Sequence, residues 1–171
     1  MTLTLSPDQI SHIREHAERT YPEECCGLLL GQIQFGEVTQ RQVADVIALE
    51  NNWNPQVAAI ADRSDGSGEQ PPEPDRRRRY WIDPRDLLTV QRQARDRQLN
   101  IIGVYHSHPD HPAIPSECDR QLAWADYAYV IVSVCQGRSQ DLQSWCLDDQ
   151  HQFHAEAIAT STATPVSSLM S

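Results

Sequence analysis

Two histidines and an aspartate stand close together in the segment GVYHSHPDHPAIPSECD, which begins at Gly103. His106 and His108 flank a single residue, and Asp119 follows eleven positions after the second histidine. Two neutral imidazoles and one carboxylate bind zinc at ~2.0–2.2 Å and leave the fourth tetrahedral position for water. Zinc lowers the pKa of such a water toward ~7, which supplies a nucleophile at neutral pH. The residue types and their spacing therefore predict hydrolysis by attack of a zinc-bound water.

The strand before these residues is expected to position the two histidines. The apolar and β-branched run Leu99–His106 predicts a buried strand. Because successive side chains of a strand point to opposite faces, His106 and His108 can lie side by side while Ser107 points away. We therefore expect both imidazoles at the end of this strand, on one of its faces.

A loop and a helix are expected to position the aspartate. Pro109, Pro112 and Pro115 disfavour both a helix and strand pairing, so they predict a shaped loop. A helix is expected to begin near Ser116 and to continue to about residue 126. The first turn of this helix can return the Asp119 carboxylate to the histidines.

Each part of this pattern also has a purely structural interpretation. A His-x-His pair alone is typical of surface or capping histidines. The Ser116-x-x-Asp119 pattern alone is typical of a capping box at the start of a helix, and a proline-rich segment is typical of a turn. The combination of all three directly after a buried strand favours a catalytic metal site.

The combined pattern resembles the JAMM (MPN-plus) metalloprotease family, whose members cleave amide or isopeptide bonds near the C-terminus of ubiquitin-like proteins. The resemblance covers nearly the whole chain and implies Zn²⁺ as the cofactor, held by His106, His108 and Asp119. The family also has an upstream glutamate in a Pro-x-Glu context, and Glu24 in YPEECCGLLLG matches it. With Ser116, all five motif positions are filled, whereas the inactive MPN-minus relatives lack ligands.

Glu24 and Ser116 are the candidate catalytic residues. Hydrolysis needs a base that takes a proton from water and returns it to the leaving amine, and a carboxylate in a partly apolar setting can do both. The apolar run after Glu24 fits such a setting, although a solvated loop carboxylate beside Glu23 is the alternative. The Ser116 hydroxyl can hold the oxyanion or orient the water, and this role is compatible with capping the helix.

The composition limits the possible partners and compartments. A chain of 171 residues is long enough for one domain with a sizeable core. The net charge of −10 argues against nucleic acid or an anionic membrane as a partner. No apolar run is long enough to span a bilayer, and the N-terminus lacks the pattern of a signal peptide. Five cysteines, an odd number, favour reduced thiols in the cytoplasm.

The rest of the sequence predicts a single α/β domain over residues 1–159, with a mixed β-sheet sandwiched by helices. Helices are expected from Ser6-Pro7 to about Arg19 and over Arg85–Gln98. Further strands are expected at residues 25–31, 38–49, 79–82, 127–134, 143–147 and 152–159. The resemblance adds that the family fold is similar to that of cytidine deaminases. Residues 62–75 are predicted to form a disordered loop, and residues 160–171 a disordered tail.

Three smaller features leave alternatives open. The run Arg76–Arg79 is typical of a solvated, charge-balanced segment, but it could also grip an acidic partner or its terminal carboxylate. Cys118 could compete as a soft metal ligand or could simply pack in the helix. His111 could contact substrate or remain a solvated loop histidine.

These observations lead to one preferred function and two alternatives. We expect a zinc metallopeptidase that hydrolyses an amide bond at the small-residue C-terminal tail of a ubiquitin-like or sulfur-carrier protein. A non-catalytic MPN-type scaffold that binds a protein is the first alternative, and Glu24 argues against it because a scaffold needs no base. A deaminase-like enzyme is disfavoured because the sequence has no Pro-Cys-x-x-Cys ligand pair.

Overall fold

The computed structural model describes residues 1–57 and 75–161. Nearly all of the predicted loop at residues 62–75 and of the predicted tail at residues 160–171 lies outside these residues. Thr160, at the border of the predicted tail, is the last residue of the final strand. None of the helices in these two ranges is long and apolar enough to cross a membrane.

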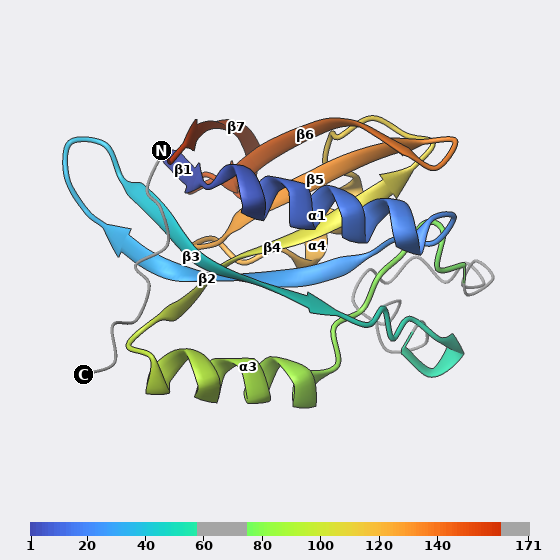
Figure 1. The fold of residues 1–171 in the computed structure, drawn as a ribbon, viewed down its shortest axis with the longest axis horizontal. Helices are drawn as coiled ribbons and strands as arrows, with labels where there is room; N and C mark the ends of the chain where they lie inside the picture. Colours follow the sequence, from blue (N-terminus) through green and yellow to red (C-terminus); the bar gives the residue numbers. More distant parts are fainter. Residues whose placement is uncertain (58–74, 162–171) are drawn as a thin grey trace.

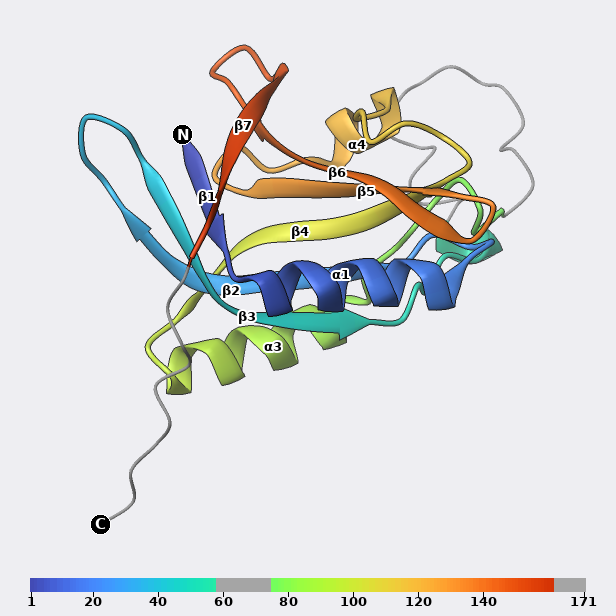
Figure 2. The same cartoon turned by 45° about the horizontal axis from the view of Figure 1, so that its top comes forward.

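Seven strands form one mixed sheet that closes into a barrel in the order β1-β3-β2-β4-β5-β6-β7 (Figures 1 and 2). The strands are β1 (Thr2–Leu5), β2 (Cys26–Gln34), β3 (Gln40–Leu49), β4 (Asn100–Pro109), β5 (Ala128–Cys135), β6 (Arg138–Leu147) and β7 (Phe153–Thr160). The mixed sheet of an α/β fold confirms that part of the prediction. In place of the expected sandwich, the sheet closes into a barrel with few helices among the described residues, and this closure was not predicted. The short strand β1 closes the barrel because it pairs in parallel with both β3 and β7.

Helices pack against both faces of this curved sheet. Helix α1 (Pro7–Thr20) begins with a capping box between Ser6 and Gln9 and buries Ile13 and Ala17 against the larger core cluster. Helix α3 (Pro84–Asp96) is capped by Asp83, and it buries Val90 and Ala94 in a second cluster on the other face. Both predicted helices are therefore confirmed, with small differences at their ends.

Three local predictions were wrong. Residues 79–82 belong to no strand or helix. The short helix α4 (Glu117–Leu122) ends before residue 126 because Ala123 adopts an extended conformation. Strand β4 continues through Pro109, which pairs with Val134 of β5. Proline is tolerated there because the last contacts of β4 with β2 are made by His106 and Ser107, so no strand on that side needs the missing N–H of Pro109.

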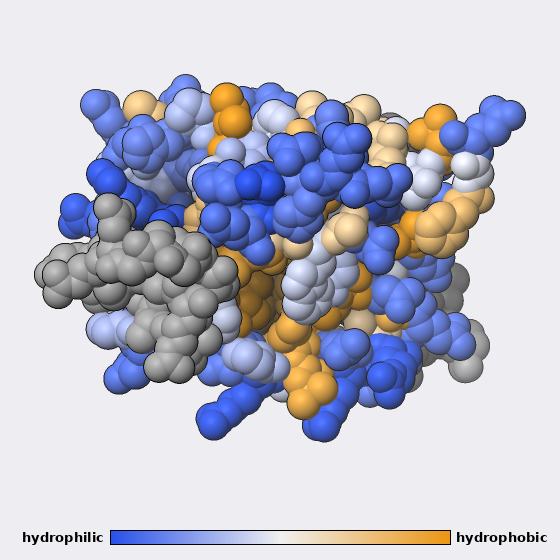
Figure 3. Space-filling model, turned by 180° about the vertical axis from the view of Figure 1, so that it is seen from behind, coloured by the Kyte–Doolittle hydropathy of each residue, from blue (hydrophilic) through white to orange (hydrophobic). Residues whose placement is uncertain are grey.

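An apolar pocket of about 270 Å³ opens between α3 and the segment after α4. Figure 3 shows apolar side chains gathered in a hollow on this face of the molecule. Aromatic side chains form much of its wall, including Tyr80, Tyr129 and the exposed Trp124. The ring of Tyr80 also stacks on the ring of His106, one of the predicted metal ligands.

Gly31 allows β2 to approach β3 closely at the β-bulge that follows Leu30. A methyl group at Gly31 would overlap the Gln42 carbonyl oxygen and lie 2.7 Å from the Ile102 side chain. We therefore expect Gly31→Ala to lower the free energy of unfolding by about 1–3 kcal/mol, measured by urea denaturation.

Gly36→Ala is the matched control, because the nearest atom to its added methyl group would be the Val38 carbonyl oxygen at 3.9 Å. This substitution is expected to change stability by no more than ~0.5 kcal/mol. Equal stabilities of the two variants would contradict the close approach at the bulge.

Candidate metal centre and active site

The three predicted metal ligands converge where β4 ends and α4 begins. The Nε2 atom of His106 lies 3.0 Å from Nε2 of His108 and 3.2 Å from Oδ1 of Asp119. The Nε2 atom of His108 lies 3.5 Å from Oδ2 of Asp119. In a tetrahedral site with bonds of ~2.1 Å, neighbouring ligand atoms lie ~3.4 Å apart. The spacing of these three side chains therefore fits a zinc ion.

Neighbouring groups orient the two imidazoles in different ways. The Nδ1 atom of His108 lies 2.9 Å from the Pro112 carbonyl oxygen, so Nδ1 carries the proton and Nε2 is left free to bind metal. His106 has no such bond to Nδ1 within the described ranges. Its ring is held instead by stacking on Tyr80, with ring centroids 4.6 Å apart. Burial lowers the pKa of His106, which favours the neutral imidazole that a metal requires.

A capping box at the start of α4 fixes the carboxylate ligand. The Ser116 hydroxyl accepts a hydrogen bond from the Asp119 N–H, and the Asp119 carboxylate accepts one from the Ser116 N–H. The Ser116 hydroxyl also donates to Oδ2 of Asp119 at 2.6 Å. Burial alone would raise the pKa of Asp119, but the two histidines and Ser116 lower it overall, so the carboxylate stays ionised.

The pairing of β2 with β4 brings Glu24 to the metal ligands. Cys26 lies opposite His106, and the next pair is fixed by two hydrogen bonds between Cys25 and Ser107. One of these bonds runs from the Cys25 N–H to the Ser107 hydroxyl, at 2.8 Å. Continuing this antiparallel register places Glu24 across from His108, with its side chain on the same face as the histidines.

The Glu24 carboxyl is buried, with 5% of the residue exposed. Burial, together with the negative charge of Asp119, raises its pKa well above the ordinary value, and the Arg79 guanidinium partly offsets this effect. A carboxyl with a raised pKa can both accept and return a proton near neutral pH. The environment of Glu24 therefore suits a general acid–base better than a solvated loop carboxylate would.

A single buried amide holds the backbone around Glu24. Asn51 donates to the carbonyl oxygens of Glu24 and Arg79, at 3.0 and 2.9 Å. Its side-chain oxygen accepts from the N–H groups of Trp53 and Trp81. All four hydrogen-bonding positions of the amide are used, so Asn51 joins the start of β2 to the segment before α3.

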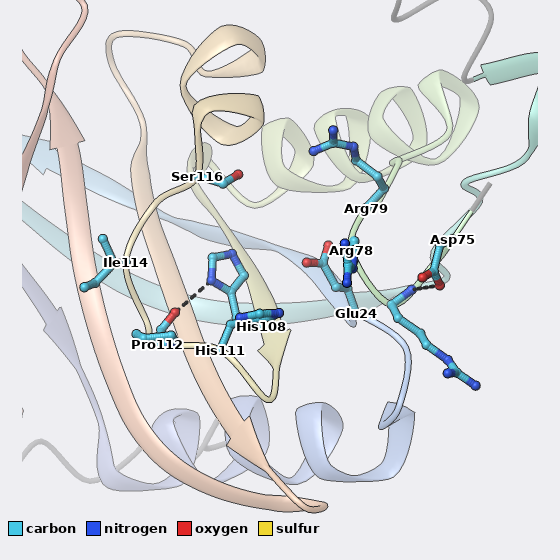
Figure 4. Close-up of a pocket in the computed structure, with 10 residues that line it drawn as sticks. Glu24, Asp75, Arg78, Arg79, His108, His111, Pro112, Ile114 and Ser116 are labelled. Atoms are coloured by element: carbon cyan, nitrogen blue, oxygen red, sulfur yellow. Dashed lines mark hydrogen bonds between the residues drawn. The ribbon is translucent and has the colours of Figure 1, made fainter. Parts of the chain in front are cut away.

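A pocket of about 670 Å³ opens over these groups. Figure 4 shows Glu24, Arg78 and Arg79 on one side of this pocket and Pro112 and Ile114 on the other. His108 and Ser116 also contribute to its wall, so a predicted ligand and both predicted catalytic residues face one space. The structure thus brings together residues that are more than eighty positions apart in the sequence.

His111 and Cys118, for which the sequence left two roles possible, lie near the site. His111 is exposed and lines the pocket, where it can meet a substrate. Cys118 is half-buried on α4 and does not belong to the converging ligand group of the described residues. Burial raises the pKa of its thiol, and the neighbouring Arg79 partly offsets this effect. The geometry therefore favours packing rather than metal binding for Cys118.

Sequence reasoning missed two residues that support the site. Asn51 follows a strand and looks like an ordinary turn residue, and its role depends on contacts with distant segments. Tyr80 was assigned to a strand, but the structure stacks it on His106. Ser107 does point away from the imidazoles as expected, yet its hydrogen bond to Cys25 was not foreseen. No local spacing in the sequence signals any of these contacts.

Comparison with known families and proteins agrees with this geometry. Residues 6–148 match the family described as prokaryotic homologs of the JAB domain. A desampylase of Haloferax volcanii is 30% identical over 125 residues, which cover 72% of this chain and 72% of the relative. A CysO-cysteine peptidase of Mycobacterium tuberculosis is 28% identical over 148 residues, covering 86% and 84% of the two chains.

A solved structure shares the fold over almost the whole chain. The solution structure of a protein from Desulfitobacterium hafniense is similar with a TM-score of 0.70 and 26% sequence identity. The match covers 96% of each chain. The likeness therefore extends beyond the motif segments to the complete barrel and its helices.

Removal of one imidazole is expected to remove the metal. Purified protein is expected to hold about one zinc ion per chain, and His106→Ala to lose most of it because two ligands bind zinc weakly. Elemental analysis by mass spectrometry after dialysis measures the zinc content of the wild-type protein and of the variant. His12→Ala is the control, since His12 is exposed on α1. Wild-type protein without zinc, or full zinc content in His106→Ala, would refute the assignment.

Proposed function

Because the chain belongs to the family of prokaryotic homologues of the JAB domain, the JAMM family that its motif resembles, we propose that it is a zinc-dependent metallopeptidase or isopeptidase. It hydrolyses an amide bond at the C-terminal tail of a ubiquitin-like or sulfur-carrier protein. The observation that carries this proposal is the buried Glu24 carboxyl, which lines a pocket together with His108, one member of the converging His-His-Asp ligand set.

The proposed metal site consists of His106, His108 and Asp119, whose separations fit zinc. A zinc ion held there would lower the pKa of a water molecule and polarise the substrate carbonyl. The Pro112 carbonyl and the stacked ring of Tyr80 hold the two imidazoles in place for it. Such support of metal ligands typically affects metal affinity or activity by about 10–100-fold.

Glu24 is the proposed general base and acid. It takes one proton from the attacking water and gives it to the leaving nitrogen. The carbonyl carbon gains an oxygen from water as its bond to nitrogen breaks. The second proton of that water is released when the new carboxyl group ionises and is taken up by the departing amine, so the products at neutral pH are a carboxylate and an ammonium group. Burial of Glu24 supports this role, because a raised pKa lets one carboxyl perform both transfers.

Ser116 is the proposed donor to the oxyanion. Ser116 is exposed and lines the pocket. In the structure the Ser116 hydroxyl donates to Asp119. Rotation of the hydroxyl can turn its hydrogen toward a substrate oxygen instead. A donor placed where charge develops is worth roughly 10²–10³-fold in kcat.

The names of the relatives support the substrate class. One relative is a desampylase, and another is a peptidase of CysO-cysteine. We therefore propose a protein substrate whose extended tail ends in small residues that can enter the pocket. The five free cysteines fit a reducing compartment, and we place the activity in the cytoplasm.

A non-catalytic binding scaffold explains the site less well. Burying a carboxyl without a partner is unfavourable, so a scaffold would gain stability by replacing Glu24 with an apolar residue. Perturbed and buried titratable groups are typical of catalytic sites. The buried Glu24 carboxyl therefore favours an enzyme.

Glu24→Gln is expected to keep zinc but to lower the turnover number by about 10²–10⁴-fold, because it removes proton transfer alone. Glu23→Gln is the matched control, since it changes the neighbouring carboxylate outside the pocket lining. Zinc content and single-turnover cleavage are measured for both variants. Undiminished cleavage by Glu24→Gln would eliminate Glu24 as the base.

The activity itself is tested with fusions of ubiquitin-like and sulfur-carrier proteins that carry an extension after a terminal Gly-Gly. Intact-mass measurement is expected to show cleavage after the second glycine, loss of cleavage with a chelator, and recovery with added zinc. Binding of these proteins without cleavage, with zinc present, would support the scaffold instead.

A further inference from the structure

Three arginines gather at the pocket without ion-pair partners among the described residues. Arg77, Arg78 and Arg79 line the same space as Glu24. The arginines that do form ion pairs in the described part of the chain are Arg41, Arg97 and Arg120, all outside this run. The carboxyl groups of Glu24 and Asp75 line the same pocket, and Arg79 also hydrogen-bonds the Cys118 thiol. Three guanidinium groups against two carboxyl groups still leave an excess of positive charge, which favours a ligand with negative charge.

The backbone of this run is fixed to the strand that carries Glu24. The Glu24 N–H donates to the Arg76 carbonyl oxygen at 2.8 Å, and Asn51 bridges the carbonyl oxygens of Glu24 and Arg79. The Arg76 side chain is used to hold the Trp53 carbonyl oxygen and so does not serve the pocket. The backbone that carries Arg77, Arg78 and Arg79 is therefore anchored beside Glu24.

The position of Glu24 indicates which part of a substrate these arginines meet. In the proposed reaction Glu24 delivers a proton to the leaving nitrogen, so the leaving group lies on the Glu24 side of the pocket. Figure 4 shows Arg78 and Arg79 on that same side. In an α-amino acid the carboxylate is only two bonds away from the amine nitrogen. A guanidinium group binds such a carboxylate through two parallel hydrogen bonds.

We propose that Arg78 and Arg79 form a subsite for the α-carboxylate of the leaving group. The favoured substrate is then a protein tail extended by one amino acid or a very short peptide, so the enzyme acts as a carboxypeptidase. This inference rests on the proposed function and specifies its substrate class. Water adds to the tail carbonyl, the C–N bond breaks, and the released amino acid keeps its carboxylate and gains a proton on its amine.

Two fusion proteins that differ in one group test the subsite. Both carry the same tail and the same single added residue, which ends in a free carboxylate in one and in a carboxamide in the other. The wild-type enzyme is expected to cleave the acid with a kcat/KM that is ~10–100-fold higher, since a charged hydrogen-bond pair is lost in the amide. Equal values would overturn the proposal.

Substitutions locate the preference. Arg79→Gln and Arg78→Gln are each expected to lower the acid-to-amide ratio, and the double variant to bring it close to one. Arg92→Gln, an exposed position on α3, is the matched control and is expected to keep the wild-type ratio. A double variant that retains the full preference would overturn the assignment to these arginines.

A binding measurement separates this inference from the proposed function. Short tail peptides that end in the carboxylate or the carboxamide are titrated into zinc-loaded Glu24→Gln protein by calorimetry. Tighter binding of the acid by about tenfold or more supports the subsite even if no fusion is cleaved, an outcome that would contradict only the proposed hydrolysis. Equal affinities would overturn the subsite whatever the cleavage results.

Discussion

Strand β2 pairs with β4 so that Cys26 lies opposite His106, and the candidate site depends on this register. Because side chains alternate along a strand, the register places Glu24 on the face that carries both histidines. A slip of one residue would turn Glu24 into the core and its neighbour Cys25 into the pocket. The Ser107 hydroxyl, bonded to the Cys25 N–H in the core, helps to exclude such a slip. The contacts that set the pairing of β2 with β4 therefore also position Glu24 relative to the two histidines.

Two local networks complete the site from opposite sides. On one side, the capping box of α4 holds Asp119 beside the histidines, so the start of a short helix becomes part of a metal centre. On the other side, Asn51 satisfies all its hydrogen bonds while it joins the backbone at Glu24 to that of Arg79. A fully satisfied buried amide rigidifies its surroundings, which is what a base and a charged subsite require. The backbone carbonyl groups of Glu24 and Arg79 are thus hydrogen-bonded although polar side chains are concentrated around them.

The sequence was informative where function depends on local spacing. His106, His108 and Asp119 lie in one short segment, so strand alternation and a helix start were enough to predict that they meet. Glu24 was placed only through the family resemblance, since nothing local signals its pairing partner. The closing strand β1, the stacking of Tyr80 and the role of Asn51 depend on contacts between distant segments. These contacts are determined by tertiary packing, which local patterns do not encode.

The most direct test of the account is a crystal structure of the zinc-loaded protein, with anomalous diffraction at the zinc edge. The account predicts one zinc ion bound by Nε2 of His106, Nε2 of His108 and a carboxylate oxygen of Asp119. It also predicts that Glu24 does not bind the metal but lies within ~2.6–3.2 Å of the fourth ligand, a water molecule. Direct ligation by Glu24, or zinc bound elsewhere, would contradict it.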